Sequence, residues 1–247
     1  MLARIRSAPW RFALPNAVTV FAIFLGFMSM FYTLQGDYQS AAWFIVFAAI
    51  TDAMDGGVAR VFNATSQFGR ELDSMADVIN LGVAPGLLLI EVYYPALGFG
   101  SFILGFTQVI AVAARLARYN MFGKANKRFF LGLPSPHTAS AIGAWILFSD
   151  AVWGEYRYPV VMIVVVPLMG ALMLSSFRYE STEFVKPGSA LETWQGWLFV
   201  LSAVIMIIIP RYYYFLMVMG MIGIGVYRSV RGESKLSIPE TAEGETG

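Results

Sequence analysis

The sequence predicts an all-α protein, a polytopic transmembrane helix bundle of about eight spans. Of its 247 residues 57% are hydrophobic and 13% are charged. That leaves too little polar surface to cover a soluble domain of this length. The mean hydropathy is +0.63, and the apolar residues form successive segments close to the roughly 20 residues that cross a bilayer as a helix. Both observations place the chain in a membrane.

The expected spans are read directly from the apolar segments. They cover residues 14–34, 40–62, 75–93, 101–122, 136–152, 159–176, 194–209 and 211–228. If the N-terminus is cytosolic, all of the 17 Lys and Arg residues except Arg157 and Arg211 lie on or near the cytosolic side. Because basic residues concentrate on that side, both termini are expected in the cytosol and the protein in the cytoplasmic membrane.

We expect the chain to be organised in four segments. Residues 1–13 mix bulky apolar side chains with three arginines, as expected of an interfacial N-terminal segment. Residues 14–180 form a core of about six spans, residues 181–230 a C-terminal membrane hairpin, and residues 231–247 a polar tail expected to be disordered. The net charge is only +1, and we expect membrane lipids rather than nucleic acid as partners.

Four aspartates lie within otherwise apolar sequence. They are Asp52, Asp55, Asp73 and Asp77. An acidic residue at the centre of a membrane helix costs roughly 2.5–3.5 kcal/mol on insertion scales, so four together indicate a site rather than packing. The spacings i, i+3 and i, i+4 put each pair on one helical face. A chain reversal near Ala64 would set the two pairs opposite one another.

Small residues and ligand chemistry sharpen this prediction. Ala59 and Gly69 fall where the two helices of the hairpin would approach closely, which small side chains permit. Converging carboxylates suit Mg²⁺ or Mn²⁺, hard ions that prefer oxygen ligands. The chain has no cysteine and one histidine, His137, which argues against zinc or copper.

The spacing of these residues resembles a known signature. Asp52-x-x-Asp55-Gly56-x-x-Ala59-Arg60, eight residues, and Gly69-x-x-x-Asp73-x-x-x-Asp77 match that of the CDP-alcohol phosphatidyltransferases. Other segments resemble the phosphatidylserine synthase branch of this family: Leu14-Pro15-Asn16-x-x-Thr19, Glu71-Leu72-Asp73-Ser74, Gly82-Val83-Ala84-Pro85, Arg115-Leu116-Ala117-Arg118-Tyr119-Asn120 and Gly132-Leu133-Pro134-Ser135-Pro136. Where that branch usually reads Ser-Phe-Gly, this chain has Asn80-Leu81-Gly82.

The resemblance implies a reaction and its partners. A phosphatidyl group would pass from CDP-diacylglycerol to the hydroxyl of L-serine, giving phosphatidylserine and CMP. It also implies two divalent ions, Mg²⁺ or Mn²⁺, a homodimer, and an active site facing the cytosol, where the nucleotide and the amino acid are found.

The resemblance also assigns roles to residues. The metal ligands would be Asp52, Asp55, Asp73 and Asp77, with Asp77 as the general base. The CDP-binding residues would be Asn16, Thr19, Asp52, Asp55, Gly56, Ala59, Arg60, Gly69 and Asp73. The residues binding serine or phosphate would be Glu71, Ser74, Asn80, Arg115, Arg118 and Asn120.

Two alternatives stay open. The acceptor could be inositol phosphate, glycerol phosphate or choline, and the donor could be an archaeal ether-lipid CDP compound. A protein of another class, a metal or solute transporter, could also use intramembrane carboxylates. A transporter, however, would not require Gly56, Ala59 and Gly69 at fixed spacings from the aspartates.

Overall fold

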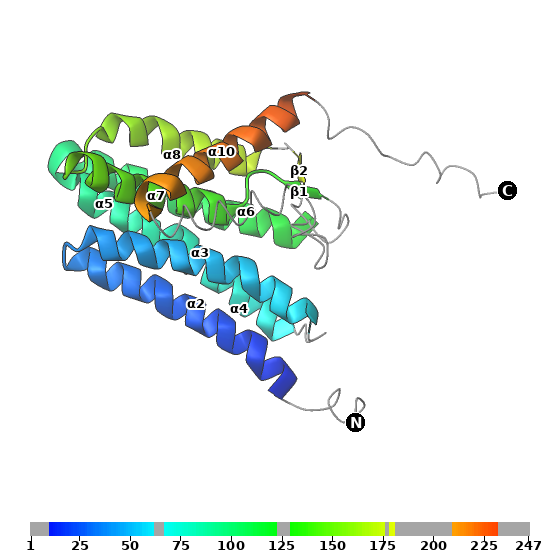
Figure 1. Cartoon of the computed structure of the whole chain (residues 1–247). Coiled ribbons are helices and arrows are strands. Elements are labelled where there is room, and N and C mark those ends of the chain that lie inside the picture. The colour runs from blue at the N-terminus through cyan, green and yellow to red at the C-terminus, as the bar shows by residue number, and fades with distance from the viewer. Residues whose placement is uncertain (1–9, 62–66, 123–128, 176–177, 181–208, 232–247) are drawn as a thin grey trace.

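The protein is a bundle of helices (Figure 1). The computed structural model describes residues 10–61, 67–122, 129–175, 178–180 and 209–231. The helices are α2 (Trp10–Leu34), α3 (Tyr38–Val61), α4 (Gln67–Asp77), the π-helical segment η1 (Val78–Val83), α5 (Ala84–Leu97), α6 (Phe99–Phe122), α7 (Ser135–Trp153), α8 (Pro159–Leu174) and α10 (Pro210–Arg231). The helical fold expected from the sequence is confirmed for these residues.

Most helices coincide closely with the expected spans. The expected span 75–93 lies within a longer helix, Gln67–Leu97. The expected span 194–209 lies almost wholly outside the described residues and stays a prediction. Within the described part, three helices are long and apolar enough to cross a membrane, namely Asn16–Leu34, Gln67–Leu97 and Phe99–Met121. The second of these is α4, η1 and α5 running on as one helix. The total of eight spans stays a prediction.

The helices pack side by side both with neighbours in sequence and with helices further along the chain. The closest pairs are α2 with α3, α5 with α6, α3 with α7, α7 with α10, and α6 with α8. Gly86 on α5 and Gly105 on α6 let their helices approach closely, because a Cβ on Gly86 would lie 2.9 Å from the Gly105 carbonyl. The start of α2 and the end of α10 lie at the same end of the bundle (Figure 1).

The outward faces of the helices are apolar. On α2, for example, Phe24, Phe27 and Phe31 are exposed, while Ala22 and Leu25 are buried. Spacings of three and four residues separate the exposed phenylalanines, so they form one stripe. Such a stripe suits contact with lipid rather than with water.

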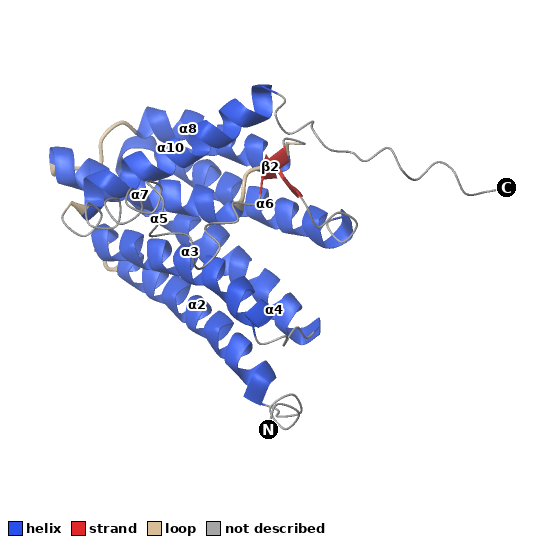
Figure 2. Cartoon of the chain, turned by 45° about the vertical axis from the view of Figure 1, so that its right-hand side comes forward, coloured by secondary structure: helices blue, strands red, loops and turns tan. Residues whose placement is uncertain are grey.

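One short ribbon departs from the all-α prediction (Figure 2). Strand β1 (Phe129–Leu131) pairs in antiparallel fashion with β2 (Arg178–Glu180), and Phe130 lies opposite Tyr179. The two segments follow α6 and α8 and meet although almost 50 residues separate them in sequence. Their backbone groups satisfy one another once the helices bring them together.

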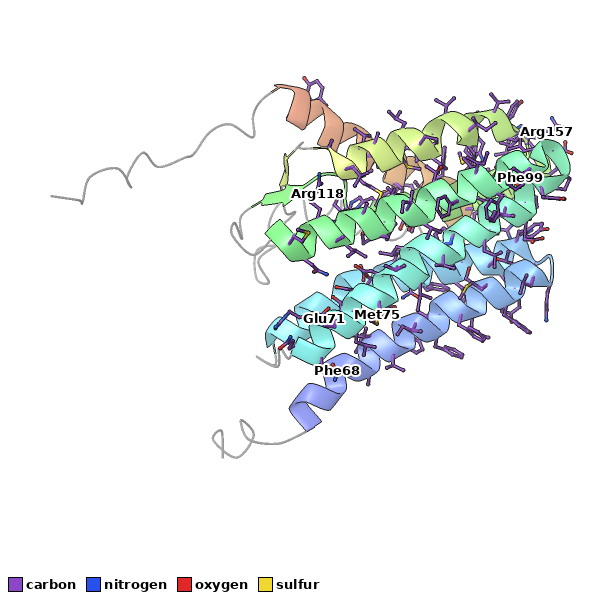
Figure 3. The ribbon with its side chains drawn as sticks, turned by 180° about the vertical axis from the view of Figure 1, so that it is seen from behind. Phe68, Glu71, Met75, Phe99, Arg118 and Arg157 are labelled. Carbon is purple, nitrogen blue, oxygen red and sulfur yellow. The ribbon has the colours of Figure 1, made fainter. Side chains whose placement is uncertain are left out.

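The opposite end of the bundle is closed by a polar network. Arg211, at the start of α10, donates to Asp150 Oδ2 at 3.1 Å and to Gln39 Oε1 at 2.7 Å. Gln39 donates in turn to Asp150 Oδ2, so α3, α7 and α10 are joined here. Figure 3 places Arg157 and Phe99 at this end and Arg118 at the other.

Candidate active site

Three of the predicted aspartates converge. Asp52 on α3 and Asp73 and Asp77 on α4 each offer a carboxylate oxygen, and these atoms lie within 4.8 Å of one another. All three residues are half-buried. Asp77 and Asp52 lie within hydrogen-bonding range of each other, and Asp77 Oδ1 is buried without a partner. Carboxylates this close need a proton or a cation between them.

The local helix explains the arrangement. Asp73 and Asp77 are four residues apart on α4 and therefore share a face. α4 packs against α2 and continues into η1, which contacts α3, the helix that carries Asp52. The convergence of Asp52 with Asp73 and Asp77 that the spacing predicted is thus present.

The rest of the signature is described in part. Asp55, Gly56, Ala59 and Arg60 lie on α3, but their side chains fall outside the described residues, as does the predicted reversal near Ala64. Their roles stay predictions. Gly69 is half-buried on α4, two turns before Asp77.

Arg115 borders the acidic cluster. It is buried on α6, and the charges of Asp77 and Asp52 act on it. Its Nη1 donates to Ser135 Oγ at 2.6 Å, whereas its Nε is buried without a partner. A buried guanidinium with a donor to spare is suited to hold a carboxylate or a phosphate oxygen.

Arg118 is used differently. Its guanidinium donates to the Met173 carbonyl at 2.9 Å and to the Leu174 carbonyl, both in the last turn of α8. Last-turn carbonyls of a helix have no donor within the helix, so Arg118 caps α8 and ties it to α6. This contact was not expected from the sequence, which predicted only a substrate-binding arginine.

Two other residues predicted to bind serine meet. Asn120 on α6 donates from Nδ2 to Ser74 Oγ on α4 at 3.3 Å, and the Ser74 hydroxyl donates to the Arg70 carbonyl. Glu71 is exposed on the same helix, at the end of the bundle where Arg118 lies (Figure 3). Glu71, Ser74, Asn120 and Arg118 therefore gather at one end of α4 and α6.

The remaining predicted residues lie deeper. On α2, Thr19 is buried and Asn16 is half-buried. Asn80 is buried in η1, where its Oδ1 has no partner. A Cβ on Gly26 of α2 would collide with that oxygen, so Asn80 faces α2.

Three residues at this site were missed by the sequence analysis. Gln108 on α6 donates to the Leu81 carbonyl of η1 at 2.8 Å and to Thr138 Oγ1 at 3.2 Å, and Ser135 accepts from Arg115. Gln108 could have been recognised in the sequence, because an uncharged polar side chain in an apolar span needs a hydrogen-bond partner.

The donor set fits a hard divalent cation. The ligand atoms are all carboxylate oxygens, and Asp77 also has an oxygen, Oδ1, that is buried without a hydrogen-bond partner. Mg²⁺ and Mn²⁺ prefer such oxygens, and either ion would offset the repulsion among the three carboxylates.

Comparison with known proteins supports the same class. Residues 12–208 match the family CDP-alcohol phosphatidyltransferase, and the chain belongs to this family of enzymes. A CDP-diacylglycerol–serine O-phosphatidyltransferase of Helicobacter pylori (strain ATCC 700392 / 26695) is 36% identical over 176 residues, 70% of this chain and 73% of the relative. An archaetidylserine synthase of Methanothermobacter thermautotrophicus is 30% identical over 175 residues, 69% of this chain and 71% of the relative.

A third relative has the same name as the Helicobacter pylori protein. The CDP-diacylglycerol–serine O-phosphatidyltransferase of Bacillus subtilis (strain 168) is 33% identical over 123 residues, which cover 50% of this chain and 69% of the relative. The resemblance inferred from the motifs is therefore confirmed at the level of the family.

Proposed function

We propose that the protein transfers a phosphatidyl group from CDP-diacylglycerol to the hydroxyl of L-serine, giving phosphatidylserine and CMP. The observation that carries this proposal is the convergence of Asp52, Asp73 and Asp77 beside buried Arg115, in a member of the CDP-alcohol phosphatidyltransferase family. The names of the serine-using relatives support serine as the acceptor. Family membership favours a transferase over the transporter.

The aspartates would hold the metal. Asp52, Asp55 and Asp73 are the main ligands in this proposal, and two Mg²⁺ or Mn²⁺ ions are expected. When bound, the ions would neutralise charge on the pyrophosphate and on the departing CMP. The carboxylates alone could not do this, since they would repel the phosphates.

Asp77 would act as the general base. It is the fourth aspartate of the signature, and its buried Oδ1 has no partner. A carboxylate near a metal can take the proton of the serine hydroxyl only if one oxygen remains available. The unpartnered oxygen supports this role.

The substrates would be held by the helices around the cluster. Gly56, Ala59 and Gly69 would leave room for the nucleotide, and Arg60, Asn16 and Thr19 would contact it. Serine carries a carboxylate and an ammonium, so its pocket needs a cation and an anion. Arg115 and Glu71 are the first candidates, with Arg118, Ser74, Asn80 and Asn120 around them.

The placement in the membrane completes the proposal. We propose eight spans with both termini in the cytosol and an active site facing it, in a homodimer. The common location of the start of α2 and the end of α10 supports an even number of spans. In this proposal residues 1–13 form the interfacial segment, 14–180 the core, 181–230 the C-terminal hairpin and 231–247 the polar tail.

The decisive experiment measures CMP release by the purified protein from CDP-diacylglycerol with each candidate alcohol in turn. We expect release with L-serine and little with inositol phosphate, glycerol phosphate or choline. A parallel reaction with an isoprenoid ether-linked CDP donor tests the lipid, because one relative is an archaetidylserine synthase. Equal or faster release with another alcohol would overturn the assignment to serine.

A further inference from the structure

The helix that carries Asp73 and Asp77 contains a carbonyl whose usual donor is missing. In an α-helix the Leu81 carbonyl would accept from the N–H of residue 85. That residue is Pro85, which has no N–H and whose ring crowds the carbonyl four residues earlier. Leu81 is fully buried, so water cannot replace the donor. Pro85 therefore removes the α-helical donor to a buried carbonyl, and buried carbonyls are as a rule hydrogen-bonded.

Gln108 supplies the missing donor from α6. Its side chain is fully buried, and Nε2 donates to the Leu81 carbonyl at 2.8 Å. Since a carbonyl can only accept, the nitrogen of the amide must face it. The same nitrogen donates to Thr138 Oγ1 at 3.2 Å, and that hydroxyl donates to the Ser135 carbonyl at 2.9 Å.

Gln108 and Arg115 act from one face of α6. They are seven residues apart, which is close to two helical turns, and both are buried. Both reach the first turn of α7, where Gln108 contacts Thr138 and Arg115 contacts Ser135. Gln108 also reaches η1, through the Leu81 carbonyl. It therefore couples the helix of the acidic cluster to the helix that carries Arg115.

The η1 segment sets the direction of the aspartates. It begins at Val78, directly after Asp77, and the N–H of Ala84 donates to the Ile79 carbonyl five residues earlier, the π-helical pattern. A π turn contains one residue more than an α turn. Rewinding it to α would turn Asp73 and Asp77 by about 100° relative to α5, because each residue of an α-helix advances by that angle.

We propose that Gln108 is a positioning residue: by donating to the carbonyl that Pro85 leaves without its α-helical donor, it holds the π turn that directs Asp73 and Asp77 toward Asp52. The inference rests on the metal site of the proposed function. It assigns Gln108 no contact with substrate or metal. Its effect passes through the backbone of η1.

The test measures Mn²⁺ binding and thermal stability of the purified protein in detergent. Binding is followed by the electron paramagnetic resonance signal of free Mn²⁺, which requires no substrate and no turnover. Gln108→Leu removes the donor with little change of volume. We expect its dissociation constant for Mn²⁺ to rise at least tenfold, together with a lower melting temperature.

A matched control separates position from stability. Leu104 is buried on the same helix one turn away and offers no hydrogen bond. Leu104→Ala should lower the melting temperature through the cavity it leaves, but it should bind Mn²⁺ like the wild type. If Gln108→Leu behaves like Leu104→Ala in both measurements, Gln108 is a packing residue and the inference is wrong.

A double variant provides the second test and guards against a Gln108→Leu protein that does not fold. In Pro85→Ala/Gln108→Leu the new N–H at position 85 can donate to the Leu81 carbonyl in an α-helical turn. We expect the melting temperature to recover while the Mn²⁺ dissociation constant stays at least tenfold raised, since the turn that directs the aspartates is lost. Recovery of both quantities would overturn the proposal.

The outcomes also separate this inference from the proposed function. A wild-type protein that binds no Mn²⁺ would overturn the metal site and the inference together. A wild type that binds Mn²⁺, with unchanged affinity in Gln108→Leu and in the double variant, would overturn the role of Gln108 alone.

Discussion

Arg115 donates a hydrogen bond of 2.6 Å from Nη1 to Ser135 Oγ. The bond joins α6 to the first residue of α7 and fixes a buried guanidinium beside Asp77 and Asp52, with its Nε unpartnered. Arg118, one turn further on, is engaged with the end of α8 instead. Of the two predicted arginines, Arg115 is therefore the better placed to bind a substrate anion.

This placement predicts that Arg115→Ala raises the serine concentration for half-maximal activity at least tenfold, which corresponds to about 1.4 kcal/mol. Arg115→Lys should recover only part of the loss, because an ammonium cannot reproduce the planar guanidinium. The KM for serine, measured at saturating CDP-diacylglycerol, is the readout. An unchanged KM for serine with a raised KM for CDP-diacylglycerol would reassign Arg115 to the donor phosphates.

A second prediction concerns the carboxylates and the metal. Asp52→Asn and Asp73→Asn should each lower CMP release by more than about a hundredfold, since even outer partners of metal ligands cost 10–100-fold. Treatment with a chelator should abolish activity, and added Mg²⁺ or Mn²⁺ should restore it. Near-normal turnover of the chelated wild type would contradict a metal-dependent reaction. Unchanged melting temperatures would establish that the variants are folded.

A third prediction separates binding from chemistry at Asp77. If Asp77 is the base, Asp77→Asn should still bind CDP-diacylglycerol in the presence of metal but not transfer its phosphatidyl group, because the serine hydroxyl keeps its proton. Equilibrium binding of the CDP-lipid and single-turnover CMP release measure the two steps. Equal loss of lipid binding in Asp77→Asn and Asp52→Asn would make Asp77 chiefly a metal ligand.

A fourth prediction concerns pH at the opposite end of the bundle. Asp37 precedes α3, and its Oδ1 accepts from the Ser40 N–H at 3.1 Å. Hydrogen bonds from the Ser40 side chain and then from its backbone hold the pKa of Asp37 below its ordinary value. The charged form is thus favoured by folding, so this stabilisation is present above about pH 4 and is lost as the pH falls through the lowered pKa.

Two variants test this cap. Asp37→Ala should lower the stability at pH 7 by about 1 kcal/mol, whereas Asp37→Asn keeps a capping oxygen and should change it little. Asp37→Asn should also remove the part of the stability loss at low pH that comes from protonation of Asp37. Thermal unfolding between pH 7 and pH 3 is the measurement. A wild type and an Asp37→Asn protein that lose stability identically on acidification would contradict the assignment.

The sequence by itself determined the helices and the acidic cluster. Apolar segments of membrane-spanning length specify helices because a backbone in lipid must satisfy its own hydrogen bonds. The four-residue spacing of Asp73 and Asp77 specifies their common face, since the helical period is local. Asp52 could be paired with them because the signature fixes both arms of one hairpin.

Only the tertiary structure decided the contacts between distant segments. The pairing of β1 with β2, the capping of α8 by Arg118 and the donation from Gln108 to Leu81 each join residues that lie 27 or more positions apart. The presence of Pro85 indicates that the Leu81 carbonyl lacks its α-helical donor, but the sequence does not identify the residue that donates in its place. That choice depends on which helices pack together, and packing is decided by the shapes of whole faces rather than by local spacing.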